Sequence, residues 1–122
     1  MQQRSTYGAR LARSVTGRDE TARHGRWRLE ATVRGRVQGV GFRRYVHTWA
    51  RRLALGGWVR NEPDGTVTLC AEGDAEAAER LARLLWGGSP VARVDAVEAR
   101  WTELRNPAPP DPTFVVERTR AR

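Results

Sequence analysis

The chain has 122 residues, which is enough for one domain with a hydrophobic core and too few for two. Its 22 basic residues are all arginine and outnumber the 14 acidic residues, so the formal net charge is +8. An anionic ligand or a nucleic acid is therefore the first partner to consider. The single cysteine excludes an intrachain disulfide, and no apolar run is long enough to cross a membrane.

Half of this net charge lies at the beginning of the chain, where residues 1–26 hold six arginines against two acidic residues. Residues 1–25 show little apolar periodicity, so we expect a disordered N-terminal extension. Residues 26–118 carry the periodic patterns of a domain, and residues 119–122 form a C-terminal tail. No apolar segment typical of a secretory signal is present, and we expect a cytoplasmic protein.

Alternating apolar residues predict strands, and apolar residues repeating every three or four positions predict helices. In the first strand, Leu29, Ala31 and Val33 fall on one face and polar residues on the other. Phe42 and Val46 share the apolar stripe of the first helix. In chain order the sequence predicts a strand at 26–34, a helix at 42–55, a hairpin of strands 58–61 and 66–71, a helix from 74 to 86, and strands at 93–103 and 113–118.

This order is β-α-β-β-α-β plus a final strand, which we expect at a sheet edge. Two helices can cover only one face of an antiparallel sheet, so the other face stays open. The predicted fold class is therefore α+β, a ferredoxin-like split βαβ sandwich. Residues 106–112 contain four prolines and should form a loop before the last strand.

Glycines and arginines concentrate between the first strand and the first helix. Gly35, Gly39 and Gly41 precede Arg43 and Arg44. Glycines let loop N–H groups approach a ligand, and the first N–H groups of a helix carry the positive end of its dipole. The segment therefore predicts a site for a compact anion such as a phosphate. On composition alone, a plain turn with solvated arginines is an equally good interpretation.

Asn61 ends the strand 58–61 and can face this loop in a split βαβ sandwich. The site would combine main-chain donors, a guanidinium group and a carboxamide, without a Walker motif or cysteines and histidines at zinc spacing. An acyl phosphate suits this set, because its carboxylate leaves easily while its phosphoryl group is held and a water is aimed in line. Arg43 and Arg44 differ by about 100° around the helix, so they cannot face the loop equally.

Two motifs make this interpretation more specific. Residues 35–43 read GRVQGVGFR, and residues 57–61 read GWVRN and are followed by DGTV at 64–67. In this order and at this distance they resemble the signatures of the acylphosphatase family, over residues 26–118. The resemblance implies the same ferredoxin-like fold and a stand-alone enzyme that hydrolyses small acyl phosphates to a carboxylate and inorganic phosphate.

The resemblance also implies the roles of particular residues. Arg43 is the catalytic group that binds the phosphate, and Asn61 is the catalytic group that positions the water. No metal or other cofactor is implied, and inorganic phosphate should be both product and inhibitor. The implied phosphate-binding residues are Val37, Gln38, Gly39, Val40, Gly41, Phe42 and Arg43.

Three further side chains have chemistry that could serve a site. His47 lies off the apolar stripe of its helix, and we interpret it as a surface histidine rather than a general base. Trp58 is expected in the core rather than as a stacking platform. Cys70, with no second cysteine, is expected to be an inert packed thiol.

Two alternatives stay open. The charge and the fold also suit an RNA- or DNA-binding module, although residues 66–71 hold no aromatic side chain on which a base could stack. The arginine-rich extension could still bind nucleic acid nonspecifically. The second alternative is a non-catalytic accessory domain of the kind found in larger enzymes. Because Arg43 and Asn61 are both present, we favour an enzyme, and we expect it to be a monomer without a membrane partner.

Overall fold

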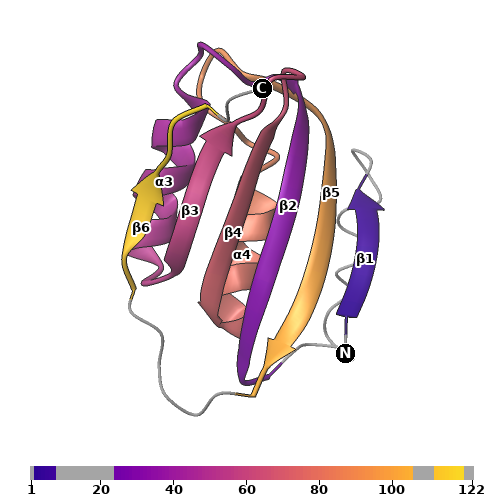
Figure 1. Cartoon of the computed structure of the whole chain (residues 1–122), viewed down its shortest axis with the longest axis vertical. Helices are drawn as coiled ribbons and strands as arrows, with labels where there is room; N and C mark the ends of the chain where they lie inside the picture. The colour runs from indigo at the N-terminus through magenta and orange to yellow at the C-terminus, as the bar shows by residue number, and fades with distance from the viewer. Residues whose placement is uncertain (1, 8–23, 106–111, 120–122) are drawn as a thin grey trace.

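The computed structural model describes residues 2–7, 24–105 and 112–119. The described strands form one six-stranded sheet in the order β1-β5-β2-β4-β3-β6, and two helices lie against the same face (Figure 1). The strands are β1 (Gln2–Tyr7), β2 (Arg26–Arg36), β3 (Gly56–Asn61), β4 (Val67–Asp74), β5 (Arg93–Leu104) and β6 (Phe114–Val116), and the helices are α3 (Phe42–Arg52) and α4 (Ala75–Leu84).

The hydrophobic core lies between the sheet and the two helices. Leu29 and Val33 of β2 are fully buried there, together with Val46 of α3 and Leu81 of α4. Every second residue of β2 from Leu29 to Val33 is buried, so the predicted two-residue period is confirmed. Burial of these apolar faces drives the layers together. The predicted α+β ferredoxin-like sandwich is thus confirmed.

The two central strands, β2 and β4, pair antiparallel with each other, as expected. The last strand, β6, lies at an edge, which was also predicted, but it runs parallel to β3. Both strands begin at the same end of the sheet, because the chain leaves β5 at that end before it enters β6 (Figure 1). This parallel pairing brings the residues after Val116 alongside the end of β3.

The structure differs from expectation at the beginning of the chain. Gln2–Tyr7 form an edge strand that pairs antiparallel with β5, with Gln2 opposite Thr102 and Tyr7 opposite Val97. An edge strand can be held by main-chain hydrogen bonds on one side alone, and the sequence of residues 2–7 has no apolar alternation that would predict a strand. Most of the expected disordered extension, residues 8–23, and most of the proline-rich loop, 106–111, lie outside the described residues.

The two described helices, of 11 and 10 residues, are too short to be membrane spans. In the part of the chain that the structure describes, neither helix has the length and apolar character required to span a bilayer.

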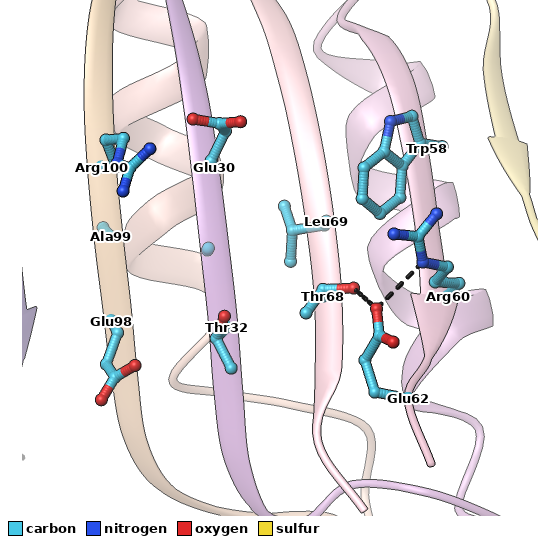
Figure 2. Close-up of a pocket in the computed structure, with 11 residues that line it drawn as sticks. Glu30, Thr32, Trp58, Arg60, Glu62, Thr68, Leu69, Glu98, Ala99 and Arg100 are labelled. Carbon is cyan, nitrogen blue, oxygen red and sulfur yellow. Dashed lines mark hydrogen bonds and ion pairs between the residues drawn. The ribbon is translucent and has the colours of Figure 1, made fainter. Parts of the chain in front are cut away.

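The sheet face opposite the helices, here called the open face, is lined by polar side chains around a hollow of about 330 Å³. Figure 2 shows Glu30, Arg100 and Trp58 on this face, with Trp58 beside Arg60. The prediction that Trp58 belongs to the core is wrong, because its neighbour Val59 takes the buried side of β3 and the pleat turns Trp58 outward.

Cys70 also lies on the open face, between the buried residues Leu69 and Ala71 of β4. Its partial burial raises the pKa of the thiol from 9.0 to about 11, and the nearby carboxylate of Glu72 acts in the same direction. The thiol is therefore protonated at neutral pH, which agrees with the expectation of an inert cysteine.

We expect an aromatic disulfide reagent to modify Cys70 roughly 100-fold more slowly in the folded chain than in denaturant at neutral pH, because raising the pKa from 9.0 to about 11 lowers the thiolate fraction by that factor. Below the raised pKa, the rate should increase about tenfold for each unit of pH. Stopped-flow absorbance of the released thiolate measures both quantities. Equal rates in the folded and unfolded chains would contradict the burial described for this thiol.

Candidate active site

A pocket of about 310 Å³ lies where the loop after β2 meets the beginning of α3, the end of β3 and the end of β6. It brings together the two residues expected to be catalytic, Arg43 and Asn61. The lining residues are Val37, Gly39, Gly41, Phe42, Arg43, Arg44, His47, Asn61 and Val116.

The pocket opens onto the N-terminus of an 11-residue helix. Gly41 is the N-cap of α3 and has a φ of 80°, and Gly39 in the same loop has a φ of 73°. These positive φ values favour glycine and let the loop curl without a side chain in the pocket. No side chain caps the first turn of α3, so its N–H groups are available to an anion.

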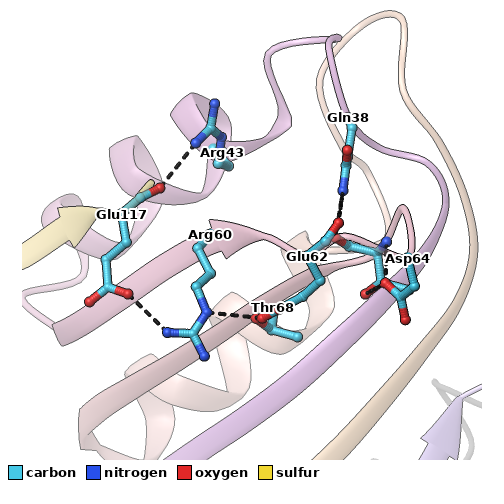
Figure 3. Close-up of polar contacts among 8 residues, drawn as sticks. Gln38, Arg43, Arg60, Glu62, Asp64, Thr68 and Glu117 are labelled. Atoms are coloured by element: carbon cyan, nitrogen blue, oxygen red, sulfur yellow. Dashed lines mark hydrogen bonds and ion pairs between the residues drawn. The ribbon is translucent and has the colours of Figure 1, made fainter. Parts of the chain in front are cut away.

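Two side chains, Gln38 and Ser89, hold the loop through three hydrogen bonds outside the pocket. Gln38 Nε2 donates hydrogen bonds to the carbonyl oxygens of Glu62, at 2.8 Å, and Thr66, at 2.9 Å (Figure 3). Ser89 Oγ donates to the carbonyl oxygen of Val40 at 2.6 Å. Gln38 and Val40, both expected among the phosphate-binding residues, are absent from the described lining of the pocket. The Gln38 side chain supports the loop instead, because it points at the turn between β3 and β4.

Arg43 is half-buried and is held by a main-chain group. Its Nη1 donates to the carbonyl oxygen of Glu117 at 3.0 Å, which ties the first turn of α3 to the segment after β6 (Figure 3). Arg44 also lines the pocket but is exposed. Both arginines thus border the pocket, but only Arg43 is half-buried and held by a main-chain carbonyl.

Asn61 ends β3 and lies at the wall of the pocket. Its Oδ1 is buried and accepts no hydrogen bond from any residue that the structure describes. Buried polar atoms in native proteins almost always have a partner, so an acceptor of this kind at a pocket wall indicates a site for a donor such as water.

Two lining residues were not expected from the sequence. His47 was interpreted as a surface residue, but it is half-buried and its ring centroid lies 6.3 Å from that of Phe114. The reason is that β6 packs against α3 on this side, which a helical wheel cannot show. Val116 of β6 reaches the same pocket and stays 44 % exposed.

The pocket is electropositive. Two guanidinium groups and a helix N-terminus meet in it, and its described lining residues include no carboxylate. Within residues 2–7, 24–105 and 112–119, no three side chains of His, Cys, Asp or Glu gather closely enough to hold a metal ion. A compact anion is the ligand that this arrangement favours.

The fold and this pocket define a small α+β domain with an electropositive pocket between a strand and a helix. A profile of the family described as Acylphosphatase matches residues 29–114. An acylphosphatase of Thermococcus kodakarensis is 50% identical over 78 residues, which are 64% of this chain and 86% of that protein. The chain therefore belongs to the acylphosphatase family, whose members are hydrolases that act on acyl phosphates.

Solved structures show the same likeness. The structure of an acylphosphatase from Coxiella burnetii is 38% identical with a TM-score of 0.64, and the match covers 75% of this chain and 93% of that chain. T. kodakarensis HypF is 30% identical with a TM-score of 0.60, and the match covers 73% of this chain but 11% of that chain. The same domain fold therefore also occurs as a small part of a larger protein.

Replacing Gln38 tests its role in supporting the loop. Gln38→Glu keeps the shape of the side chain but turns an acceptor toward two carbonyl oxygens, so we expect the free energy of unfolding to fall by about 1–3 kcal/mol at neutral pH. Urea unfolding followed by tryptophan fluorescence measures this loss. Part of it should return in acid, because the carboxyl can then donate a hydrogen bond.

Gln38→Ala is the control for this experiment. It removes the donor without adding a charge and should cost less than Gln38→Glu at neutral pH. A Gln38→Glu variant as stable as the parent would show that the amide does not make these contacts.

Proposed function

We propose that this pocket hydrolyses the carboxyl–phosphate bond of small acyl phosphates without a metal ion. In this mechanism the amides of the 37–41 loop and Arg43 hold the phosphoryl group, and Asn61 positions the attacking water. The observation that carries the proposal is the meeting of an uncapped helix N-terminus, Arg43 and the unpartnered Oδ1 of Asn61 in one pocket.

Phosphoryl binding follows from the donors at the pocket. A guanidinium group has five N–H donors, and the bond to the Glu117 carbonyl at 3.0 Å uses one of them. The remaining N–H groups of Arg43 can bind two phosphoryl oxygens side by side. The N–H groups at the start of α3 supply further donors and a favourable dipole. These groups would stabilise the charge that develops on the phosphoryl oxygens during transfer.

Water activation requires orientation more than basicity. Asn61 Oδ1 would accept a hydrogen bond from the water and leave a lone pair of the water oxygen facing phosphorus. A bond then forms between the water oxygen and phosphorus while the bond from phosphorus to the acyl oxygen breaks. The acyl group leaves as a carboxylate, and the protons of the water pass to phosphate and solvent. A carboxylate is a weak base, so no general acid is needed to protonate it.

Binding of RNA on the open face is the weaker candidate. Modules of this fold that bind RNA stack bases on aromatic residues of their central strands. In β2 and β4 the described side chains on this face include Thr32, Thr68 and Cys70, and none of them is aromatic. An accessory domain is also disfavoured, because Arg43 and Asn61 meet at one pocket. A cytoplasmic location and a monomeric state stay predictions.

Substitution of either catalytic residue tests the mechanism. We expect Arg43→Ala and Asn61→Ala each to lower kcat/KM for benzoyl phosphate by about 10²–10³-fold, the usual cost of removing one preorganised group from such a site. Release of phosphate measures the rate, and circular dichroism checks the fold. Arg51→Ala, an exposed arginine in the last turn of the same helix, is the control and should leave the rate unchanged.

Arg44→Ala distinguishes the two arginines of the pocket. Because Arg44 is exposed, its removal should cost less than removal of Arg43. If Arg44→Ala lowered kcat/KM more than Arg43→Ala, Arg44 would be the residue that binds the phosphate. An Arg43→Ala or Asn61→Ala variant with the kcat/KM of the parent would refute the role proposed for that residue.

Inorganic phosphate and chelators test the ligand and the absence of a metal. Phosphate should inhibit competitively with benzoyl phosphate, because it would occupy the same donors. Prolonged dialysis against a chelator should leave kcat unchanged. Activity that disappears with the chelator and returns with a divalent cation would overturn the metal-free mechanism.

A further inference from the structure

Glu117 joins the pocket to the open face. Its carbonyl oxygen accepts the hydrogen bond from Arg43 at 3.0 Å. Its carboxylate reaches the other side of the sheet and pairs with Arg60 Nη1, also at 3.0 Å (Figure 3). One residue therefore contacts the proposed phosphate-binding arginine through its main chain and a second arginine through its side chain.

Arg60 is held on several sides. Its Nε pairs with Glu62 at 2.9 Å, and its guanidinium carbon lies 4.2 Å from the centre of the Trp58 ring. Thr68 Oγ1 donates to the same carboxylate oxygen of Glu62 (Figure 2). The side chains of Arg60 and Glu62 are only 19% and 12% exposed. Partly buried pairs of this kind are screened less by solvent than surface pairs.

Glu62 is also connected to the loop that borders the pocket. Its carbonyl oxygen accepts the bond from Gln38 that supports the 37–41 loop. A chain of contacts thus runs from Arg43 through Glu117, Arg60 and Glu62 to Gln38 (Figure 3). It begins at the first turn of α3 and ends at the loop, so both parts of the anion site are attached to Arg60.

The segment that carries the Glu117 carbonyl is anchored at its beginning, where Phe114 is buried and lies near His47 of α3, and has fewer buried contacts at its end. β6 has three residues and lies at the edge of the sheet, and Val115 and Val116 are 42% and 44% exposed. The Glu117 amide donates to the Val59 carbonyl at 2.8 Å, which is the last main-chain bond to β3 among the described residues. The ion pair with Arg60 adds a side-chain contact at Glu117. Short edge strands with few buried contacts open readily, so such a contact has a large effect on local order.

We propose that the Arg60–Glu117 ion pair on the open face is a positioning device for Arg43. It fixes the carbonyl group of Glu117, and that carbonyl holds the guanidinium of Arg43 at the anion site. The inference rests on the proposed function of Arg43 and adds two positioning residues that do not touch the substrate.

The test measures phosphate binding and turnover in the Glu117→Gln variant of the full chain. This variant keeps the main-chain carbonyl and loses the charge that pairs with Arg60. We expect the Kd for inorganic phosphate and the KM for benzoyl phosphate to rise about 3- to 10-fold, the scale at which packed networks couple residues. A purely structural role would lower the active fraction, and therefore kcat, and would leave KM and Kd unchanged.

Glu72→Gln is the matched control. It removes the partner of Arg28 in another ion pair of the open face, with a bond of 2.6 Å. None of the contacts described above connects this pair to Arg43. Its Kd for phosphate should equal that of the parent. Glu117→Gln with the same Kd and KM as Glu72→Gln would overturn the inference.

A double-mutant cycle separates this inference from the proposed function. Arg60→Gln also loses the contacts with Glu62 and Trp58, so it should weaken phosphate binding at least as much as Glu117→Gln. In the Arg60→Gln background, Glu117→Gln should weaken binding no further, because the pair is already broken. Additive effects would show that the two residues act independently and would overturn the inference. If Arg43→Ala binds phosphate as tightly as the parent, the proposed function fails, whereas weakening by Arg43→Ala without weakening by Glu117→Gln refutes only the positioning role.

Discussion

The two hydrogen bonds of the Gln38 amide hold the loop after β2 against the β3–β4 turn, beside the pocket. The loop that carries Gln38 follows β2, whereas Asn61 ends β3, and β4 lies between these strands. Two strand spacings amount to about 10 Å, so the loop must bend across the end of β4 to face Asn61. Gln38 fixes this bend by bonding to Glu62 and Thr66 at the two ends of the β3–β4 turn. These bonds therefore keep the N–H groups of the loop close to the carboxamide of Asn61.

Arg60 and Arg43 differ in the kind of acceptor that each contacts. Arg60 faces two carboxylates, and its hydrogen bond with Glu62, followed by the one with Glu117, raises the pKa of its guanidinium. Arg43 contacts a carbonyl oxygen, which orients it without cancelling its charge. A carboxylate at the same place would compete with a phosphate for the guanidinium. Arg60 is thus paired with carboxylates on the open face, whereas Arg43, at the pocket, has a neutral acceptor.

The regular parts of the fold could be predicted because burial imposes a period on the sequence. Leu29 to Val33 alternate, Phe42 and Val46 repeat with helical spacing, and the glycine-rich junction between them marks the pocket. The pairing of Gln2–Tyr7 could not be predicted, because main-chain bonds at a sheet edge leave no side-chain pattern. His47 was misplaced because its environment depends on β6, which comes from a distant part of the chain.

Glu117 shows why the remaining contacts lie beyond sequence reasoning. The sequence places it in the predicted strand 113–118 and carries no sign of its partners, and the neighbouring residues Val115 and Val116 are exposed. The parallel pairing of β6 with β3 puts the same residue next to both arginines. Extended backbone directs a side chain away from the plane of its own peptide groups, so one residue can contact both layers of a sandwich. The Glu117 carboxylate can therefore contact the open face while the carbonyl contacts Arg43 at the pocket, and a charge outside the pocket is linked to the guanidinium inside it.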